Sequence, residues 1–345
     1  MIASVSKGMH YVEKADLLAR LKPEIDIVDQ TMQSDLQNLV HKGLIPTSLV
    51  EVLEYALFKG GKRIRPLLCI LTADLCGNNS KDIYPLAIAF EYLHVATLLH
   101  DDVIDHADSR RGRPAANTLF GLSPAILAGD FLHARSMFLA GTLGGKRSLE
   151  LICSATEAMV AGEFLQLTNA QNFNQSEKDY FAVINGKTAL FIGAVCQTGG
   201  IFAGTGDKAI EALKTYGANL GKAFQIQDDL LDYLGDPAKT GKTVGNDFCE
   251  GKMTLPLIHA LKTAGKTESN FLLDLLKGEK SERSAKLEEA KDIIDKSGGF
   301  EYGRQIAEKL IAAGVASLDI FTAKHNEQIV ATLTGLARYV IHRDK

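Results

Sequence analysis

Apolar residues recur at spacings of three and four through almost the whole sequence, and this pattern constrains the fold more than any other feature. One example is the set Leu49, Val52, Leu53, Ala56 and Leu57. Such a stripe is typical of an amphipathic helix, whereas the strict alternation of a half-buried strand is hard to find. Most of the eight prolines separate successive helical windows, as residues that start or stop helices do. The chain is therefore predicted to be all-α.

Several predicted helices are apolar over much of their circumference, as expected for the interior of a bundle. They cover residues 85–107, 123–142, 148–170, 176–199 and 207–234. No Gly/Ser-rich linker or short repeat divides the 345 residues. We therefore expect a single domain over 1–345, with a motif-bearing core at about 60–256 and a helical C-terminal part at 257–345.

Composition and charge exclude some classes of function. The formal net charge of −4 provides no basic footprint for nucleic acid. The five cysteines form no CxxC pair, and their odd number favours reduced thiols and a cytoplasmic location. The first twenty residues have no continuous apolar segment of a secretory signal. No uninterrupted apolar run approaches the ~18 residues of a spanning helix, although peripheral membrane contact stays open.

Two copies of the pattern Asp-Asp-x-x-Asp lie within the apolar helices. The aspartates are Asp101, Asp102 and Asp105 in LLHDDVID, and Asp228, Asp229 and Asp232 in QIQDDLLD. The first and last aspartate of each copy share one helix face, with Cβ atoms about 5–6 Å apart. Like charges so placed repel, and burial raises the cost, so a bound cation is the natural explanation. Carboxylates together with substrate phosphates favour Mg²⁺. A solvated acidic face is the alternative, but the apolar flanks argue against it.

Basic residues precede and follow the first acidic motif. GGKRIRP occupies 60–66, and SRRGRP occupies 109–114. Arginine offers a planar fork to phosphate oxygens and lysine a point charge, while glycines let backbone amides approach an anion. Each run alone is also compatible with a solvated loop. Together with the two acidic motifs, they favour the binding of a diphosphate.

Rival chemistries match less well. A Walker A loop requires four residues between its glycines, but five separate Gly235 from Gly241, and a helix precedes them where a strand should. The sequence contains no HExxH, GxSxG, kinase or Rossmann pattern and no Cys/His metal spacing. His94 lies seven residues before Asp101, on the same predicted helix face.

With these motifs, the sequence resembles the trans-prenyltransferase (polyprenyl synthetase) family, and within it the long-chain, octaprenyl-type synthases. The resemblance rests on GGKRIRP at 60–66, LLHDDVIDHADSRRGRP at 98–114, KT at 187–188 and FQIQDDLLDYLGD at 224–236. It implies a single-domain isoprenoid-synthase helical bundle around a central cavity, usually a homodimer, with the acidic motifs on opposite sides of the substrate. It also implies that isopentenyl diphosphate is condensed onto an allylic diphosphate such as farnesyl diphosphate.

The resemblance assigns roles by motif position. Up to three magnesium ions would be ligated by Asp101, Asp102 and Asp105 and by Asp228, Asp229 and Asp232. The allylic diphosphate would be bound by Arg110, Lys187 and Lys242, and isopentenyl diphosphate by Lys62, Arg65, His94 and Arg111. Thr188 and Gln225 would face the reacting carbons, which makes them catalytic together with Asp101, Asp105, Lys187 and Asp228.

Product length depends on the residues one turn before Asp101, namely Ala96 and Thr97. The resemblance implies that small residues here leave a product tunnel open, which predicts a heptaprenyl to decaprenyl product for quinone side chains. A short-chain farnesyl or geranylgeranyl diphosphate synthase is the alternative. A terpene cyclase needs no second diphosphate, which the basic motifs disfavour. A non-catalytic partner subunit usually lacks the acidic motifs, which are complete here.

Overall fold

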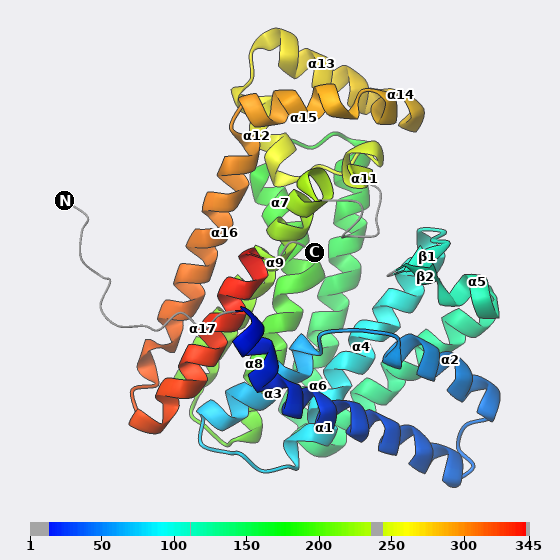
Figure 1. Cartoon of the computed structure of the whole chain (residues 1–345), viewed down its shortest axis with the longest axis vertical. Coiled ribbons are helices and arrows are strands. Elements are labelled where there is room, and N and C mark those ends of the chain that lie inside the picture. The colour runs from blue at the N-terminus through cyan, green and yellow to red at the C-terminus, as the bar shows by residue number, and fades with distance from the viewer. Residues whose placement is uncertain (1–13, 111, 236–243, 343–345) are drawn as a thin grey trace. The chain divides into compact units, whose positions relative to one another are not determined.

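The computed structural model describes residues 14–110, 112–235 and 244–342, and these are overwhelmingly helical, as predicted (Figure 1). In the N-terminal half, the elements are α1 (Lys14–His41), α2 (Thr47–Phe58), α3 (Ile64–Leu75), α4 (Ile83–Ile104), β1 (Ser109–Arg110), β2 (Arg113–Pro114), α5 (Ala116–Phe120) and α6 (Leu122–Gln171). They continue with α7 (Glu177–Ile184), η1 (Asn185–Ala189), α8 (Leu190–Phe202), α9 (Asp207–Leu234), α11 (Asn246–Cys249), α12 (Leu255–Thr263), α13 (Lys266–Lys277), α14 (Lys280–Ala285), α15 (Leu287–Lys296), α16 (Gly299–Ala316), η2 (Ser317–Ile320), η3 (Lys324–Asn326) and α17 (Glu327–Ile341).

The described chain forms two compact units. The first contains the described residues up to Ile152, together with Val195–Glu211 and Asp319–Leu336. The second contains Cys153–Ala194, the described residues of 212–318, and residues 337–342. The chain passes from one unit into the other within α6, α8, α9, η2 and α17. The single domain expected from the sequence stays a prediction.

Helix α4 lies at the centre of the first unit, where it packs against α1, α2, α3 and α5. Leu86, Phe90 and Leu93 are fully or almost fully buried in this packing. Because nearly every side chain before the acidic motif is apolar, the hydrophobic effect places α4 inside the unit. The motif itself falls at the C-terminal end of the helix.

Two helical stretches are long and apolar enough to cross a membrane by length and composition. They are Ile83–Ile104 and Glu177–Phe202. Burial inside the protein covers 72% of the apolar window in the first and 61% in the second. Within the described part of the chain, both therefore match the core helices of a globular protein as well as they match a membrane span.

The predicted helical windows agree with the observed helices, and glycine explains one of the interruptions. Windows 123–142 and 148–170 both fall in α6, where Gly145 adopts φ 74° and ψ −175° and kinks the helix. Window 207–234 coincides with α9. Window 176–199 is divided into α7, a π-helical turn η1 and α8. Since π turns often occur at functional sites, η1 marks a place of interest.

The C-terminal helices belong largely to the second unit. Helix α12 packs against α13, α15 and α16 through buried residues that include Leu257, Ile258 and Leu261. The described residues of 257–342 are mostly helical. Helix α12 begins three residues after Lys252, which belongs to the site described below.

Candidate active site

The first acidic motif occupies the C-terminal end of α4. Asp101 lies in the last turn, and Asp105 is the C-cap residue, whose backbone N–H donates to the Asp101 carbonyl at 2.8 Å. The Asp101 side chain is half-buried and that of Asp105 is exposed. A helix C-terminus carries negative partial charge, so two carboxylates there are unfavourable without a cation. The geometry therefore fits the binding of a positive ion.

Asp102 has a different environment from its neighbours. Its residue is only 3% exposed, and its carboxylate accepts a hydrogen bond from Arg110 Nε at 2.6 Å. The short β1–β2 hairpin, which pairs Arg110 with Arg113, fixes the position of Arg110. The ion pair therefore joins the acidic helix to the arginine-rich loop. Metal ligation by Asp102 stays a prediction. In this structure its carboxylate is already paired with the guanidinium of Arg110.

Three of the four residues predicted to bind isopentenyl diphosphate lie in the first unit. Lys62 is exposed just before α3, Arg65 lies in the first turn of α3, and His94 lies in α4, two turns before Asp101. Arg111 and Lys242 lie outside the described residues. Next to this region is a cavity of about 490 Å³ between α2, α4 and the hairpin, whose lining includes Tyr55, Leu98, Asp102 and Arg110.

The chain-length residues are both placed on α4. Ala96 is 2% exposed, and Thr97 is half-buried, with its hydroxyl donating to the His94 carbonyl at 2.8 Å. The cavity next to the hairpin is lined by other residues of this helix. The product tunnel therefore stays a prediction.

The second acidic motif also lies at a helix C-terminus, because α9 ends at Leu234. Its middle residue Asp229 is fully buried and accepts three hydrogen bonds: from Tyr180 Oη at 2.7 Å, Lys252 Nζ at 2.8 Å and Gln225 Nε2 at 3.2 Å. A buried carboxylate needs such partners, because an unpaired buried charge is very costly. Asp229 therefore organises the protein around it.

The partners of Asp229 have perturbed pKa values. Burial and the adjacent carboxylate raise the pKa of Tyr180 well above its usual value, so the phenol stays protonated and donates. Burial alone would lower the pKa of Lys252, but Asp229 and Asp247 raise it well above the usual value. Lys252 therefore remains a cation between two carboxylates.

Asp232, the last aspartate of the second motif, has a raised pKa. Burial, and then the nearby Asp247, raise its pKa to about 7. The backbone N–H of Asp247 donates to Asp232 Oδ2 at 3.0 Å, and Asp247 Oδ2 lies 2.7 Å from Lys252 Nζ. Among the described residues, no three His, Cys, Asp or Glu side chains form a ready metal cluster. Mg²⁺ commonly needs only one or two carboxylates besides phosphates and water, so the donor set fits.

Lys187 and Thr188 lie in the π-helical turn η1 of the second unit. Lys187 Nζ is 2.5 Å from Glu163 Oε2 of α6. Thr188 Oγ1 donates to Gln225 Oε1 at 3.1 Å, so the structure brings together the pair predicted to face the reacting carbons. The turn packs closely on α6, where a Cβ atom at Gly162 would lie 2.8 Å from the Lys187 backbone nitrogen.

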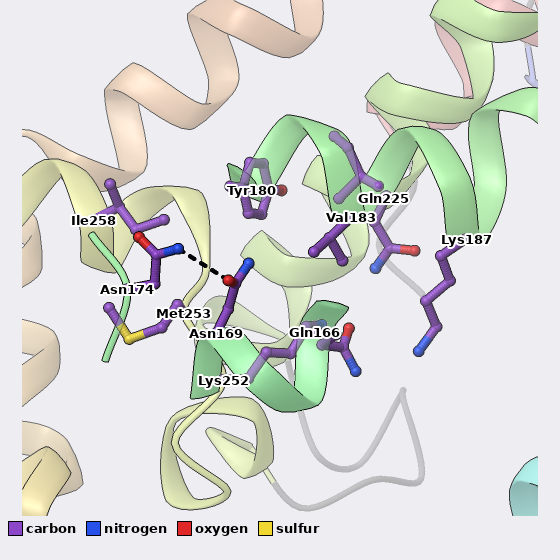
Figure 2. A pocket seen from close by; sticks show the side chains of 11 residues that line it. Gln166, Asn169, Asn174, Tyr180, Val183, Lys187, Gln225, Lys252, Met253 and Ile258 are labelled. Atoms are coloured by element: carbon purple, nitrogen blue, oxygen red, sulfur yellow. Dashed lines mark hydrogen bonds between the residues drawn. The ribbon is translucent and has the colours of Figure 1, made fainter. Parts of the chain in front are cut away.

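A cavity of about 390 Å³ lies beside these residues in the second unit. Figure 2 shows side chains from α6, α7, η1, α9 and the segment before α12 around it, with Lys187 at the end opposite Asn174 and Met253. The dashed line is the hydrogen bond from Asn174 Nδ2 to Asn169 Oδ1, 2.9 Å long. Two ammonium groups and several amides therefore border one concave site, in which each ammonium is already paired with a carboxylate.

Sequence reasoning assigned no role to Glu163, Tyr180, Asp247 or Lys252. Asp247 and Lys252 follow the second motif closely, and a search for charged residues downstream of it would have found them. Tyr180 and Glu163 carry no signal in the sequence, because their partners are 49 and 24 residues away. Only the folded chain shows that they belong to the site.

These features define a class of protein: an all-helical protein with two aspartate motifs at helix ends and cations beside them, a set of groups that suits a diphosphate and a divalent metal. Comparison with known sequences makes the class specific, since the profile of the polyprenyl synthetase family matches residues 46–294. The chain belongs to this family. It is a prenyltransferase, as the sequence motifs predicted.

Similar proteins include both long-chain and short-chain synthases. The octaprenyl diphosphate synthase of Escherichia coli is 36% identical over 291 residues, which are 84% of this chain and 88% of that protein. A short chain isoprenyl diphosphate synthase of Methanocaldococcus jannaschii is 34% identical over 279 residues, 80% of this chain and 83% of that protein.

Among solved structures, a polyprenyl synthase from Caulobacter crescentus, complexed with calcium and isoprenyl diphosphate, superposes with a TM-score of 0.83. It is 32% identical, and the match covers 98% of this chain and all of that chain. The all-α fold and the family resemblance are therefore confirmed.

Proposed function

We propose that this enzyme condenses isopentenyl diphosphate onto an allylic diphosphate such as farnesyl diphosphate, and that the product is a heptaprenyl to decaprenyl diphosphate. The observation that carries the reaction is the same in both units. Each acidic motif ends a helix, buries its middle aspartate against a protein cation, and leaves its outer aspartates in an environment that favours a metal ion. The long product is supported by the small residues Ala96 and Thr97 and by the octaprenyl relative.

Magnesium ions, up to three, would be held by Asp101 and Asp105 and by Asp228 and Asp232, and they would neutralise charge on the diphosphate. Arg110 and Lys187 bind oxygens of the allylic diphosphate, and Lys242 is assigned to the same group. In the absence of substrate, Lys187 is paired with Glu163, so a diphosphate either replaces this carboxylate or extends the contact. Preorganised cations of this kind stabilise charge that develops as the bond to the leaving group breaks.

The condensation itself is a substitution at carbon. The allylic carbon–oxygen bond breaks with its electron pair leaving on the diphosphate, and the isopentenyl double bond attacks the allylic cation. The released diphosphate then accepts the proton whose loss restores a double bond. Thr188 and Gln225, joined by a hydrogen bond of 3.1 Å, orient the reacting carbons. Lys62, Arg65, His94 and Arg111 hold the isopentenyl diphosphate. Water must stay away, because it would quench the cation.

The assembly and location are also proposed. In the first unit, α6 exposes Leu127 and Phe138, and in the second it exposes Val160 and Phe164. Large exposed apolar side chains along one helix favour a partner surface, and a symmetric homodimer is the commonest solution. The cysteine pattern favours the cytoplasm. The apolar product, a precursor of quinone side chains, favours peripheral contact with a membrane.

The test is to incubate the purified enzyme with labelled isopentenyl diphosphate and farnesyl diphosphate, with magnesium or with EDTA, and to size the products by chromatography. We expect a magnesium-dependent series that ends in long polyprenyl chains. A product that stops at farnesyl or geranylgeranyl length would retain the reaction and make the enzyme a short-chain synthase. No incorporation with any allylic primer would contradict the proposal and favour a cyclase or a partner subunit.

A further inference from the structure

Arg63 has an unusual backbone conformation. It is the residue before α3 and adopts φ 52° and ψ 32°, in the left-handed region that residues with a side chain rarely occupy. A strained conformation of this kind persists only where the surrounding structure holds it. The strain lies inside GGKRIRP, between Lys62 and the first turn of α3 that contains Arg65.

The side chain of Arg63 supplies the contacts that hold this conformation. The residue is 4% exposed, and its guanidinium reaches three other helices of the first unit. Nε lies 2.7 Å from Asp29 Oδ1 of α1, Nη1 lies 2.8 Å from Glu91 Oε1 of α4, and Nη2 donates to the Leu57 carbonyl near the end of α2 at 2.6 Å. One planar group therefore fixes the loop against α1, α2 and α4.

Stability alone does not account for this arrangement. Glu91 is also 4% exposed, and the net contribution of a buried ion pair is small, because desolvation offsets most of the attraction. Such a pair does impose a definite geometry, since the guanidinium fork accepts only certain positions of its partners. The residues whose positions it sets lie next to those predicted to bind isopentenyl diphosphate.

Arg63 lies between Lys62 and Arg65 in sequence, and its partner Glu91 lies one helical turn before His94 on α4. We propose that Arg63, through Glu91, is a positioning residue that sets Lys62 and Arg65 on one element and His94 on another at the spacing required by the diphosphate of isopentenyl diphosphate. This inference rests on the proposed function and deepens it. Arg63 itself does not touch the substrate.

The kinetic signature of such a role is selective. Misplacing Lys62 and Arg65 weakens the binding of isopentenyl diphosphate, while the groups assigned to the allylic diphosphate belong to other elements. We expect Arg63→Lys, which keeps the charge and loses the fork, to raise the KM for isopentenyl diphosphate by about tenfold. The KM for farnesyl diphosphate should change less than twofold.

Two further variants separate the backbone from the side chain. Arg63→Gly adopts the left-handed conformation freely but has no guanidinium. If positioning depends on the side chain, it should behave like Arg63→Lys or worse. Arg135→Lys is the matched control, because Arg135 forms a half-buried ion pair with Asp35 in the same unit and carries none of the contacts to the 60–66 loop described above.

The experiment compares both KM values, the thermal midpoint, and calorimetric binding of isopentenyl diphosphate alone, in wild type and the variants. A selective loss of isopentenyl diphosphate affinity in the Arg63 variants, absent from Arg135→Lys at a similar thermal midpoint, would support the inference. Equal changes in both KM values, or the same change in the control, would overturn it.

Two other outcomes can be distinguished from a loss of positioning by Arg63. If the Arg63 variants do not fold, Glu91→Gln retains Arg63 and tests the same contact, and an unchanged affinity for isopentenyl diphosphate in that variant overturns the inference. If the wild type binds isopentenyl diphosphate but forms no product, the proposed function fails, while the binding data still decide the role of Arg63.

Discussion

In each acidic motif, the middle aspartate has a different environment from the two outer ones. Asp102 and Asp229 are buried against Arg110 and Lys252, respectively, so each of these acids already has a cation from the protein. The outer aspartates lie at helix C-termini, where the helix dipole adds to their repulsion. We therefore expect a metal ion to stabilise the outer aspartates, whereas the middle ones are held by partners within the protein.

This division predicts opposite effects of two substitutions. Asp101→Ala should lower kcat by about two orders of magnitude or more, because metal-assisted charge stabilisation is lost, with the thermal midpoint nearly unchanged. Asp229→Asn should instead lower the free energy of unfolding by about 3 kcal/mol, since it leaves a buried charge with one partner fewer. Product assays and thermal unfolding followed by circular dichroism measure both. If Asp229→Asn unfolds like wild type, the buried network has no structural role.

A histidine pair predicts how stability depends on pH. Burial, and then the nearby His100, lower the pKa of His133, and Asp130 opposes the shift. The folded state therefore disfavours the protonated form, so this contribution to stability is complete above the ordinary pKa of about 6.5 and is lost as the pH falls through the folded pKa. His133→Phe removes this dependence. Between pH 7 and 5, the thermal midpoint of wild type should fall more than that of His133→Phe, and parallel curves would contradict the shift.

At the scale of helices, the sequence predicted much more of the fold than of the contacts. The apolar periodicity placed α9 at 207–234, and the prolines marked interruptions, because both effects are local along the chain. The kink at Gly145 was found only in the structure. The family resemblance, and not the spacing of residues, implied that Thr188 and Gln225 belong to one site. The ion pair of Lys187 with Glu163 was not predictable, because it depends on how η1 packs on α6.

That packing is close enough to be tested with one methyl group. A Cβ atom at Gly162 of α6 would lie 2.8 Å from the backbone nitrogen of Lys187, so Gly162→Ala must displace η1. We expect a several-fold rise in the KM for the allylic diphosphate, because Lys187 moves with the turn. Gly206→Ala is the control, since a Cβ atom there has no neighbour within 4 Å. Equal kinetics in the two variants would show that the position of η1 does not matter.

Helix α4 carries the prediction about product length. Ala96 is 2% exposed and precedes Asp101 by five residues, so Ala96→Phe inserts a ring into the core about one turn below the acidic motif. Overpacking should cost about 1–3 kcal/mol of stability. The metal ligands are unchanged, so turnover should persist while the products become shorter, as chromatography of the reaction would show. An unchanged product distribution would exclude a tunnel beside Ala96.

At the scale of the whole molecule, the exposed apolar side chains concentrate on α6. Phe138 of the first unit is 55% exposed and Phe164 of the second is 67% exposed. Exposed aromatic rings cost free energy in water, and burying them between two copies of the same helix recovers it. A homodimer through α6 gives both rings a reason to lie on the surface.

The prediction is that Phe138→Glu and Phe164→Glu each weaken the dimer, because a charge introduced into an apolar interface must be desolvated. Sedimentation equilibrium at a series of concentrations should show a dimer for wild type and a shift toward monomer for both variants.

Leu44→Glu is the control, since Leu44 is 65% exposed in the segment after α1 and lies away from α6 in sequence. A dimer that survives both phenylalanine substitutions, or that Leu44→Glu weakens equally, would place the interface on another surface. A monomeric wild type would mean that the exposed rings serve a different partner, and the proposed peripheral contact with a membrane would then be the first to test.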